Sequence, residues 1–471
     1  MEGDGSRVCP IVVRDPDDGS VVGELQPSSD RDLEAALEAG AGTSRRIHLP
    51  TYERVRILET CAARVSAEHE AFAQLIATEG IKTIREARVE AARCVETLKL
   101  SAEEAKRIGG EVLAMDQTVG GAGRVGWYQH RPVGLIAAFT SFNDPLNLAA
   151  HKLGPAMAAG APIILKPHPQ TPFSALKLRD AMIEAGAPQE MVQVVLGGAK
   201  LGGNLVRDTR PRIVSFTGGR VAGSSIVRES GFKRLILELG GVGVVLVAAD
   251  ADLVHATQAI SSGAFWAAGQ NCVHAQRIVV ERPVADELRQ RLVDLAKGLR
   301  QGPKRDPGTD LGPCVNPGVA SSVLDRVERA RSAGARVLTG GTGDGSRVAA
   351  TWIENLPNDH ELLTNEVFGP VATLETRAHL AGLFDTLERA DHALNVAVFT
   401  SSIETAFTAY ERANAGAVIV NDSTDFRIDA MPFGGAGGAG LGREGVRFAI
   451  EEIMEKKMLV FRRPLGNRIE A

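Results

Sequence analysis

Three polar residues of the sequence have side-chain types that together could carry out covalent chemistry. Cys272 follows a glycine and a polar pair in FWAAGQNCVHAQR, Glu238 lies between an apolar segment and two glycines in LILELGG, and Asn143 follows the apolar run in AAFTSFNDP. A thiol whose pKa is lowered can act as a nucleophile. A carboxylate can act as a general base, and an amide can donate to a developing oxyanion.

Each of these residues also has an interpretation without chemistry. A single cysteine is more often a small buried hydrophobe than a nucleophile. Glu238 could end a strand and face solvent, whereas an unpaired buried carboxylate would be costly. Asn143 could cap a helix or an Asx turn before Pro145. Taken one at a time, the residues leave both interpretations open.

A glycine turn follows the strand-like segment PRIVSFTGG and continues into FTGGRVAG. A strand, a glycine turn and a helix can bring a dinucleotide close to the N-terminus of the helix. Gly218 and Gly223 are separated by four residues, so the segment is not a full GxGxxG motif and is a weak signal alone.

The elements that must position these residues follow from the hydrophobic periodicity. Residues 30–45, 51–78 and 83–109 show helical spacing. Short apolar strands then alternate with amphipathic helices up to about residue 250, and the alternation restarts beyond it with a helix predicted to run to Ala268. This pattern predicts parallel sheets in two doubly wound α/β domains.

The composition excludes several classes of protein. The chain has 471 residues and a formal net charge of −5, so a basic face for nucleic acid or an anionic membrane is not expected. No apolar run approaches the roughly 20 residues that span a bilayer, and the polar start MEGDGSRV is not a secretory signal. Five scattered cysteines indicate neither a disulfide framework nor a metal site. We therefore expect a cytoplasmic protein that holds no metal.

Seven motifs occur along the chain in a fixed order. They are PVGLIAAFTSFNDP, KPHPQTP, FTGGRVAG, LELGG, GQNC, NEVFGP and MPFGGAGGAGLGREG. By these motifs the chain resembles the aldehyde dehydrogenase superfamily over nearly its whole length. It is most similar to the branch that contains lactaldehyde, phosphonoacetaldehyde and non-phosphorylating glyceraldehyde-3-phosphate dehydrogenases.

The resemblance implies an architecture and an assembly. A dinucleotide-binding domain would comprise residues 1–119 and 132–238, and a catalytic domain residues 239–430. A small oligomerisation sheet would comprise residues 120–131 and 457–471. Members of the family form homodimers or homotetramers, and the sequence does not choose between them.

The resemblance also assigns catalytic roles. Cys272 would add to the aldehyde, and Asn143 with the backbone N–H of Cys272 would stabilise the resulting oxyanion. Transfer of a hydride to the nicotinamide would leave a thioester, which water activated by Glu238 would hydrolyse to the acid. CoA-acylating relatives lack this glutamate, so its presence favours a free acid as the product.

The residues that match the family's cofactor contacts lie in three of the motifs. Lys166 and Glu366 would bind ribose hydroxyls, and Phe368 would pack beside the nicotinamide ribose. The glycine turn would contribute Gly218, Gly219 and Gly223.

The choice between NAD and NADP stays open. NAD-preferring members usually carry a glutamate where this chain has Pro169, so a carboxylate that repels a 2′-phosphate is missing. The absence of this carboxylate slightly favours NADP. Arg207 and Arg220 are the candidate partners for the 2′-phosphate.

Two further departures lie in glycine-rich loops. Gly219 replaces the usual serine of the turn, which should change the pyrophosphate contacts modestly. In the C-terminal loop, Gly437 and Ala439 replace a lysine and a serine. We expect this loop to be more mobile than in other members.

The substrate is predicted from arginines. Arg93 and Arg427 match positions where members acting on phosphorylated aldehydes bind an anion. Asn271 stands where those members often carry a further arginine, and His274 is a candidate replacement. The alternative for each arginine is an ion pair of little energetic value.

Three functions follow from these observations. The first is NAD(P)-dependent oxidation of a small aldehyde with a phosphonate, phosphate or carboxylate end. The second is oxidation of a neutral aldehyde such as lactaldehyde. The third is a catalytically silent scaffold on the same fold. The presence of Cys272, Glu238 and Asn143 together argues against the scaffold.

Overall fold

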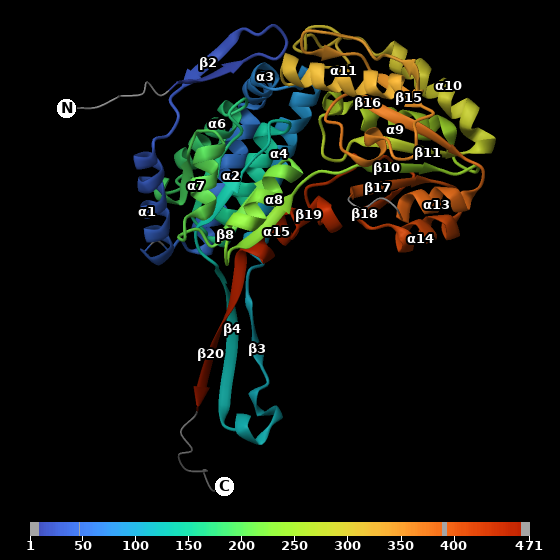
Figure 1. Ribbon diagram of the computed structural model, residues 1–471. Helices are drawn as coiled ribbons and strands as arrows, with labels where there is room; N and C mark the ends of the chain where they lie inside the picture. The colour runs from blue at the N-terminus through green and yellow to red at the C-terminus, as the bar shows by residue number, and fades with distance from the viewer. Residues whose placement is uncertain (1–8, 47, 389–392, 463–471) are drawn as a thin grey trace.

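The computed structural model describes residues 9–46, 48–388 and 393–462, so the ends of the predicted domains at residues 1–8 and 463–471 lie outside the described residues. Two α/β bodies lie side by side, and a long antiparallel arm projects from the N-terminal one (Figure 1).

The N-terminal body is built on a six-stranded sheet. Its strand order is β19-β9-β8-β5-β6-β7, and all neighbours are parallel except β19 and β9. The strands are β5 (Ile136–Phe139), β6 (Ile163–Lys166), β7 (Val192–Val194), β8 (Ile213–Thr217), β9 (Arg234–Glu238) and β19 (Gly440–Leu441). The short strand β19 comes from the C-terminal part of the chain, so the sheet is completed by a segment that follows the second body in sequence.

Helices cover both faces of this sheet because successive strand residues point in opposite directions. Ile136 and Ala138 belong to the core shared with α2, α4, α5 and α6, whereas Ala137 belongs to the core shared with α1, α7 and α8. These helices are α1 (Asp30–Arg46), α2 (Thr51–Ala67), α4 (Ile84–Ala105), α5 (Pro145–Ala159), α6 (Phe173–Glu184), α7 (Ala199–Arg207) and α8 (Arg220–Glu229). Helices α3 (His69–Glu79) and α15 (Val446–Ile453) pack at the edge of the first core.

The C-terminal body contains a seven-stranded sheet in the order β12-β15-β16-β11-β10-β17-β18, parallel except for β12. The strands are β10 (Gly243–Val247), β11 (Ala275–Glu281), β12 (Arg336–Thr339), β15 (Thr351–Glu354), β16 (Val371–Arg377), β17 (Ala393–Phe399) and β18 (Ala415–Val420). Its helices are α9 (Leu253–Phe265), α10 (Arg282–Gly298), α11 (Pro317–Ser332), α12 (Glu361–Thr364), α13 (Leu380–Glu388) and α14 (Ile403–Arg412). The predicted pair of doubly wound α/β sheets is confirmed.

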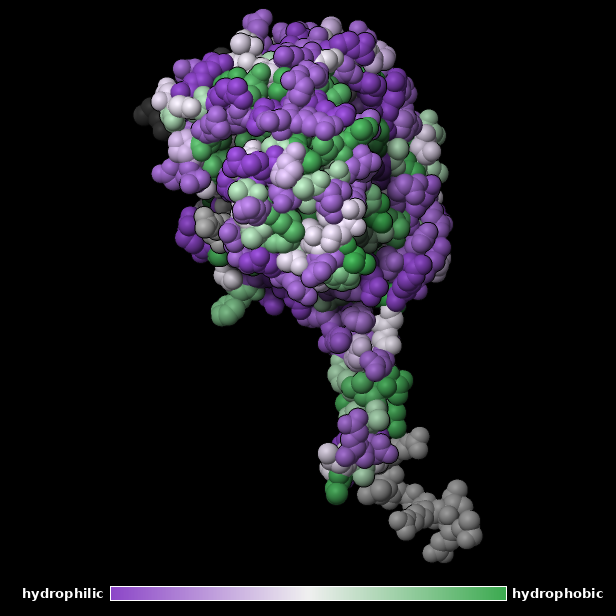
Figure 2. Space-filling model, turned by 90° about the vertical axis from the view of Figure 1, so that its right-hand side faces the viewer, coloured by the Kyte–Doolittle hydropathy of each residue, from purple (hydrophilic) through white to green (hydrophobic). Residues whose placement is uncertain are grey.

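The arm is a three-stranded antiparallel sheet in the order β20-β4-β3. Its strands are β3 (Gly110–Leu113), β4 (Arg124–Pro132) and β20 (Met454–Arg462). The sequence analysis had assigned β3 to the dinucleotide-binding domain and began the last strand at 457. Hydrophobic residues gather on the arm (Figure 2), and Met458, Leu459, Val460 and Phe461 are exposed there.

Two smaller pairs of strands lie outside these sheets. They are the hairpin of β1 (Ile11–Arg14) with β2 (Val21–Leu25) and the pair of β13 (Gly343–Asp344) with β14 (Arg347–Val348). Within the described ranges, every helix is too short or too polar to cross a bilayer.

Two local predictions were wrong. The predicted helix over 51–78 is two helices, because the chain turns at Glu68, whose φ of −100° and ψ of 20° are not helical. The helix predicted to run to Ala268 ends at Phe265, and the 3₁₀ turn η4 (Trp266–Gly269) follows it. This second break shapes the site described below.

Replacing Leu98 tests the packing of the first core. Leu98 on α4 is fully buried, so Leu98→Ala should lower the free energy of unfolding by about 2–5 kcal/mol through lost contacts and a residual cavity. Lys99→Ala on the exposed side of the same helix is the matched control and should change it little. Equal midpoints in a denaturant titration would contradict this account of the core.

Candidate active site

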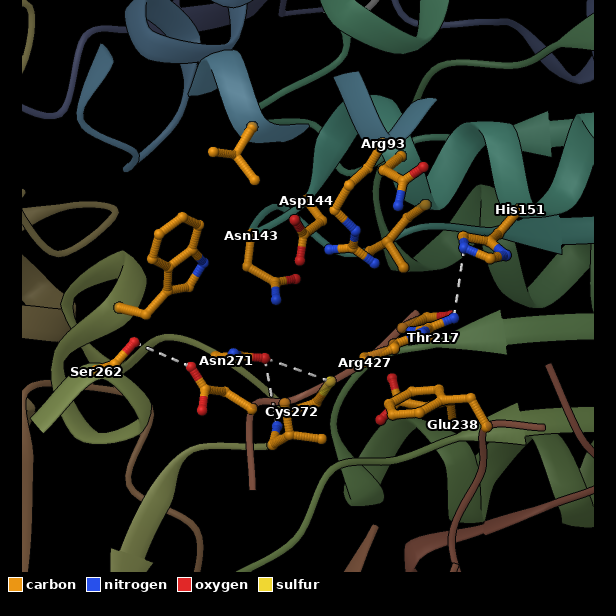
Figure 3. A pocket seen from close by; sticks show the side chains of 17 residues that line it. Arg93, Asn143, Asp144, His151, Thr217, Glu238, Ser262, Asn271, Cys272 and Arg427 are labelled. Carbon is orange, nitrogen blue, oxygen red and sulfur yellow. Dashed lines mark hydrogen bonds between the residues drawn. The ribbon is translucent and has the colours of Figure 1, made fainter. Parts of the chain in front are cut away.

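The predicted catalytic and substrate-binding residues meet around one cavity of about 240 Å³. Cys272, Glu238 and Asn143 line it together with Arg93, Arg427 and Asn271 (Figure 3). They come from both α/β bodies: Asn143 and Glu238 lie at the ends of strands in the first sheet, and Cys272 precedes β11 in the second. Residues separated by more than 300 positions in the chain therefore share one site.

An unusual backbone positions Cys272. Ala267 and Ala268 have φ values of 51° and 53°, and Gly269 has 66°, so three consecutive residues are left-handed. Alanine seldom adopts this conformation, and it persists only where surrounding contacts impose it. One such contact is the buried carboxylate of Glu86 on α4, which accepts a hydrogen bond of 2.8 Å from the N–H of Ala267.

Gln270 ties the same turn to the neighbouring loop. Its buried amide donates to the carbonyl of Pro313 at 3.0 Å and accepts from the N–H of Val315 at 2.9 Å. At Gly269 a Cβ atom would lie 2.2 Å from the carbonyl oxygen of Gly369, so only glycine fits. The nucleophile-bearing turn is thus fixed at both ends by buried groups.

The thiol of Cys272 is in its neutral form at neutral pH. Burial raises the pKa of this thiol well above its usual value, the charge of Glu238 raises it further, and Arg427 acts in the opposite direction. The sulfur contacts Oδ1 of Asn271 at 3.7 Å. A thiol in this state needs a proton acceptor before it can attack.

Glu238 can serve as such an acceptor. It ends β9 and is buried, and its carboxylate accepts a hydrogen bond of 3.2 Å from the N–H of Gly240. Burial, with the negative charge of Glu444 as the second cause, raises the pKa of Glu238 to about 7. The carboxyl group therefore exchanges protons in the neutral range, where a general base is most effective.

The amide of Asn143 points into the cavity without a hydrogen-bond partner among the described residues (Figure 3). The alternative interpretation, a helix cap, is wrong: the residue before α5 is Asp144, and the carboxylate of Glu90, not Asn143, accepts from the N–H groups of Leu146 and Asn147 in the first turn. Asp144 is instead paired with the buried Lys82. An unoccupied amide donor beside a thiol is the arrangement that an oxyanion requires.

Arg427 is a largely buried cation at the same cavity. Its guanidinium lies 3.7 Å from the centre of the Phe433 ring, and Nη2 lies 3.4 Å from Nε2 of His151. The nearest carboxylate, Glu444, is 4.0 Å away and is already bound by Lys152 at 2.5 Å. Nε of Arg427 has no hydrogen-bond partner within the described chain. This cation is therefore available to an anionic ligand.

Arg93 lines the cavity but is also part of an ion pair. Its Nη2 and Nε donate to the two oxygens of Asp429 at 2.7 and 3.3 Å. Asp429 also binds Nε2 of His151 at 2.8 Å and Nδ2 of Asn147 at 3.3 Å. These contacts hold the pKa of Asp429 well below its usual range, although burial opposes them. The positive charge of Arg93 is thus partly neutralised.

The sequence analysis missed His151, Asn147 and Asp429. His151 and Asn147 follow Asn143 at intervals of four residues, which is helical spacing and could have indicated a shared face on α5. Asp429 lies two residues beyond Arg427 and carries no comparable signal.

His274 does not replace the missing arginine, because it does not line the cavity. It is fully buried behind the site, with Nδ1 3.2 Å from the carbonyl oxygen of Val367, and burial lowers its pKa to about 4. Asn271 does line the cavity, and its Oδ1 also accepts from the N–H of Val273 at 3.3 Å.

A second hollow of about 340 Å³ lies between α7 and α8. Lys166, at the end of β6, lines it without a counter-ion among the described residues, and burial lowers its pKa to about 8. Arg207 also lines this groove but is bound to Glu229 at 2.5 Å. Arg220 at the start of α8 is exposed and makes no ion pair in the described chain.

The remaining predicted cofactor residues do not line this groove. Gly218 and Gly219 join β8 to α8, and Gly223 packs so closely that a Cβ would lie 2.3 Å from Leu239. Burial raises the pKa of Glu366 to about 8, and its Oε1 has no hydrogen-bond partner in the described chain. The ring of Phe368 lies 5.5 Å from that of Phe142.

The two unsatisfied groups fit a dinucleotide. A buried lysine without a counter-ion and a buried carboxyl oxygen without a donor are costly alone. Ribose hydroxyl groups could satisfy both Lys166 and Glu366, because a hydroxyl both donates and accepts. Of the predicted cofactor residues only Lys166 lines this groove, and the roles of Gly218, Gly219, Gly223, Glu366 and Phe368 stay predictions.

The C-terminal glycine loop contacts the segment that follows Glu238. Ala439 is fully buried, and its carbonyl accepts a 2.9 Å hydrogen bond from the N–H of Leu239, next to Glu238. Gly437 has a φ of +55°. The expected mobility of this loop stays a prediction.

A thiol, a carboxyl group and a free amide around one cavity, beside a nucleotide-sized groove on a parallel sheet, are features of a dinucleotide-dependent α/β oxidoreductase. Residues 4–459 match the aldehyde dehydrogenase family, so the chain belongs to that family. It is an aldehyde dehydrogenase that uses NAD(P).

Three relatives illustrate the similarity. The chain is 43% identical over 457 residues to aspartate-semialdehyde dehydrogenase 1 of Pseudomonas canavaninivorans, covering 95% of this chain and 96% of that protein. It is 31% identical to aldehyde dehydrogenase 21 of Physcomitrella patens, solved with the reaction product succinate (TM-score 0.94; 99% and 97% covered). It is 32% identical to glyceraldehyde-3-phosphate dehydrogenase of Methanocaldococcus jannaschii, solved with NADP (TM-score 0.92; 96% and 99% covered).

Alkylation separates the cysteines by environment. Cys61, Cys94 and Cys314 are fully buried, whereas Cys9 is exposed and Cys272 lines the cavity. Iodoacetamide should therefore modify Cys9 and Cys272 much faster than the other three, and the rate at Cys272 should rise with pH because its pKa is raised. Peptide mass spectrometry measures each site. A Cys272 as protected as Cys61 would contradict the open cavity.

Proposed function

We propose that this enzyme oxidises a small aldehyde with an anionic end to its carboxylic acid through a thioester on Cys272. The observation that carries the proposal is the position of Arg427, a buried cation without a close carboxylate partner, at the same cavity as Cys272, Glu238 and Asn143. The three relatives described above act on, or were solved with, small anionic compounds.

The first step is attack by the thiol. Glu238 removes the proton of Cys272, either directly or through a water molecule, and the sulfur adds to the aldehyde carbon. The free amide of Asn143 and the backbone N–H of Cys272 donate to the oxyanion that forms. Bound NAD(P) would supply the hydride acceptor, and loss of the hydride from this carbon would leave a thioester on Cys272.

The second step is hydrolysis. Glu238 accepts a proton from a water molecule, which attacks the thioester and releases the acid. A pKa near 7 suits this role, since the carboxyl group is largely charged just above neutrality and can be protonated during the step. Burial raises the pKa of Glu238, so no separate catalytic group is needed to make it a stronger base.

The anionic end of the substrate lies at Arg427, with Arg93 as a weaker partner because Asp429 already binds it. Asn271 contributes a neutral amide where an arginine would strengthen the anion site. This arrangement supports a single carboxylate more than a doubly charged phosphate. Lactaldehyde is the second candidate, favoured by the partial neutralisation of Arg93.

The cofactor contacts are proposed for the groove between α7 and α8. Lys166 and Glu366 bind ribose hydroxyls, Phe368 packs by the nicotinamide ribose, and the glycine turn of Gly218, Gly219 and Gly223 approaches the pyrophosphate. Pro169 leaves room for a 2′-phosphate. Arg220 is better suited than Arg207 to bind it, because Glu229 holds Arg207.

The arm supports a homo-oligomer, either a dimer or a tetramer. Its edge strand β20 exposes four consecutive apolar residues, 458–461, which a monomer would leave in water. We assign the first sheet to dinucleotide binding, the second to catalysis and the arm to assembly. Free cysteines throughout the described chain agree with a reducing, cytoplasmic location.

Arg427→Ala should impair oxidation of an anionic aldehyde selectively. Succinic semialdehyde and butanal share a four-carbon chain and differ in the carboxylate. We expect kcat/KM for succinic semialdehyde to fall about tenfold or more, because a buried charge-assisted contact is lost, and that for butanal to change much less. Arg447→Ala, an exposed arginine on α15, is the control. Equal losses for both aldehydes would contradict the anion site.

The rate of hydrolysis should depend on the charge of Glu238. Because its pKa is raised to about 7, lowering the pH through 7 protonates the base, so kcat should fall on the acidic side. The residual rate of Glu238→Gln should lack this dependence. Steady-state kcat measured across the neutral range tests the prediction. Identical pH profiles for the two proteins would contradict a titrating base at this position.

A further inference from the structure

Helix α4 carries two buried glutamates one turn apart. Glu86 and Glu90 are four positions apart, so they lie on the same face of the helix. Neither takes part in the proposed chemistry, and neither lines the cavity around Cys272. Burying a carboxylate is costly unless hydrogen-bond donors satisfy it. The donors of these two carboxylates therefore identify the segments that they hold in place.

The carboxylate of Glu86 joins the two α/β bodies. Its Oε2 accepts from the N–H and the hydroxyl of Thr83 at 2.8 and 3.0 Å, which completes the capping box that begins α4. A capping box needs only this first oxygen. The second oxygen, Oε1, accepts from the N–H of Ala267 at 2.8 Å, in the turn before Cys272. Glu86 therefore connects α4 to the turn that carries the nucleophile.

The contact from Glu86 acts on a backbone conformation that is costly by itself. Ala267 and Ala268 are both left-handed, and such residues keep this conformation only where surrounding contacts impose it. Loss of the carboxylate would release the first residue of the turn. Cys272 lies five residues beyond Ala267, and a displacement of about 1 Å at a reacting group can lower a rate about a hundredfold.

The carboxylate of Glu90 holds the segment of the oxyanion donor. Its Oε1 accepts from the N–H groups of Leu146 and Asn147 at 2.8 and 3.0 Å, in the first turn of α5. Its Oε2 accepts from Nζ of Lys82 at 2.8 Å, and Lys82 also binds the carboxylate of the residue that follows Asn143. Both sets of contacts fix the backbone that carries the Asn143 amide.

We propose that Glu86 and Glu90 are positioning residues that act through the backbone of other segments. Glu86 holds Cys272 through the left-handed turn before it. Glu90 holds Asn143 through the start of α5. The turn of helix between the two glutamates, about 6 Å at 1.5 Å per residue, then sets the separation of a nucleophile and an oxyanion donor that come from different bodies and face one cavity (Figure 3). This inference rests on the proposed function, which gives Cys272 and Asn143 their roles.

Glu90→Leu removes the acceptor and keeps a side chain of similar size. The rate of the first turnover, followed as reduced cofactor formed from succinic semialdehyde, should fall about tenfold or more, because the oxyanion donor is displaced. In an Asn143→Ala background the same substitution should lower this rate by less than about threefold, because the group on which Glu90 acts is gone. Glu90→Gln keeps an oxygen for both N–H groups and should retain most of the rate.

Glu86→Leu should lower the same rate about tenfold or more, with or without Asn143→Ala, because it acts on Cys272. Adding Ala267→Gly should partly restore the rate, since glycine adopts left-handed backbone without strain. A role confined to the helix cap would not respond to a substitution in the turn. Thr83→Val is the matched control: it weakens the capping box and keeps the bond from Ala267, so the rate should stay within about threefold.

Folding is checked independently of turnover. Thermal midpoints and the binding of succinate by calorimetry should show that each variant is folded with an intact anion site. Glu96→Gln, at an exposed glutamate of α4, is the surface control and should change neither rate nor binding. Should a leucine variant not fold, Glu86→Asp or Glu90→Asp keeps the charge and shortens the side chain by one methylene group. The same comparisons then apply, with the same expected direction.

The outcomes separate this inference from the proposed function. A loss of rate in Glu90→Leu that is equally large in the Asn143→Ala background would overturn the role of Glu90, because the effect would be a general one. Failure of Ala267→Gly to restore any rate to Glu86→Leu would overturn the role of Glu86. First turnover at the wild-type rate in both Cys272→Ala and Asn143→Ala proteins would instead overturn the proposed function itself.

Discussion

Burial of ionisable groups between the two α/β bodies is the constraint on which the site depends. Removing water raises the pKa values of the Cys272 thiol, the Glu238 carboxyl group and the Glu366 carboxyl group together. The Cys272 thiol and the Glu238 carboxyl group line the same cavity, and the charge of Glu238 raises the pKa of the thiol further. Opening the site to solvent would return each pKa toward its ordinary value and separate their protonation ranges.

This burial is achieved by a chain that leaves the first body and returns to it. Strands β9 and β10 follow each other in sequence but belong to different sheets, so the segment after Glu238 bridges the two bodies. After β18, the chain comes back through Arg427 and Asp429 to pair β19 with β9 and to pack α15 on the first core. Buried ion pairs such as that of Lys152 with Glu444 hold the returning C-terminal segment against the first body.

Much of the site could be predicted from local sequence. Cys272, Glu238 and Asn143 lie at the ends of apolar segments, and the order of motifs identified their neighbours before any geometry was known. Local sequence could not reveal which residues far apart in the chain form contacts. Arg93 and Asp429 are 336 residues apart, and whether an arginine is free or paired depends on contacts that periodicity does not encode.

The backbone conformation before Cys272 could not be predicted from the sequence either. Left-handed residues are expected at glycine or asparagine, and Ala267 and Ala268 give no such signal, so the sequence predicts a helix that runs through them. The conformation depends on Glu86 and Gln270, which lie on other segments. The same limitation affected His274, whose position beside the nucleophile in sequence did not reveal that its ring is buried away from the cavity.

The central claim is a covalent thioester on Cys272 that Glu238 hydrolyses. The most direct measurement is mass spectrometry of Glu238→Gln protein mixed with NAD(P) and succinic semialdehyde. The account predicts that reduced cofactor accumulates more slowly than with the wild type, because the thiol has lost its base, stops near the number of subunits, and leaves a succinyl group on the peptide that contains Cys272. Continued rapid turnover without any adduct on that peptide would contradict it.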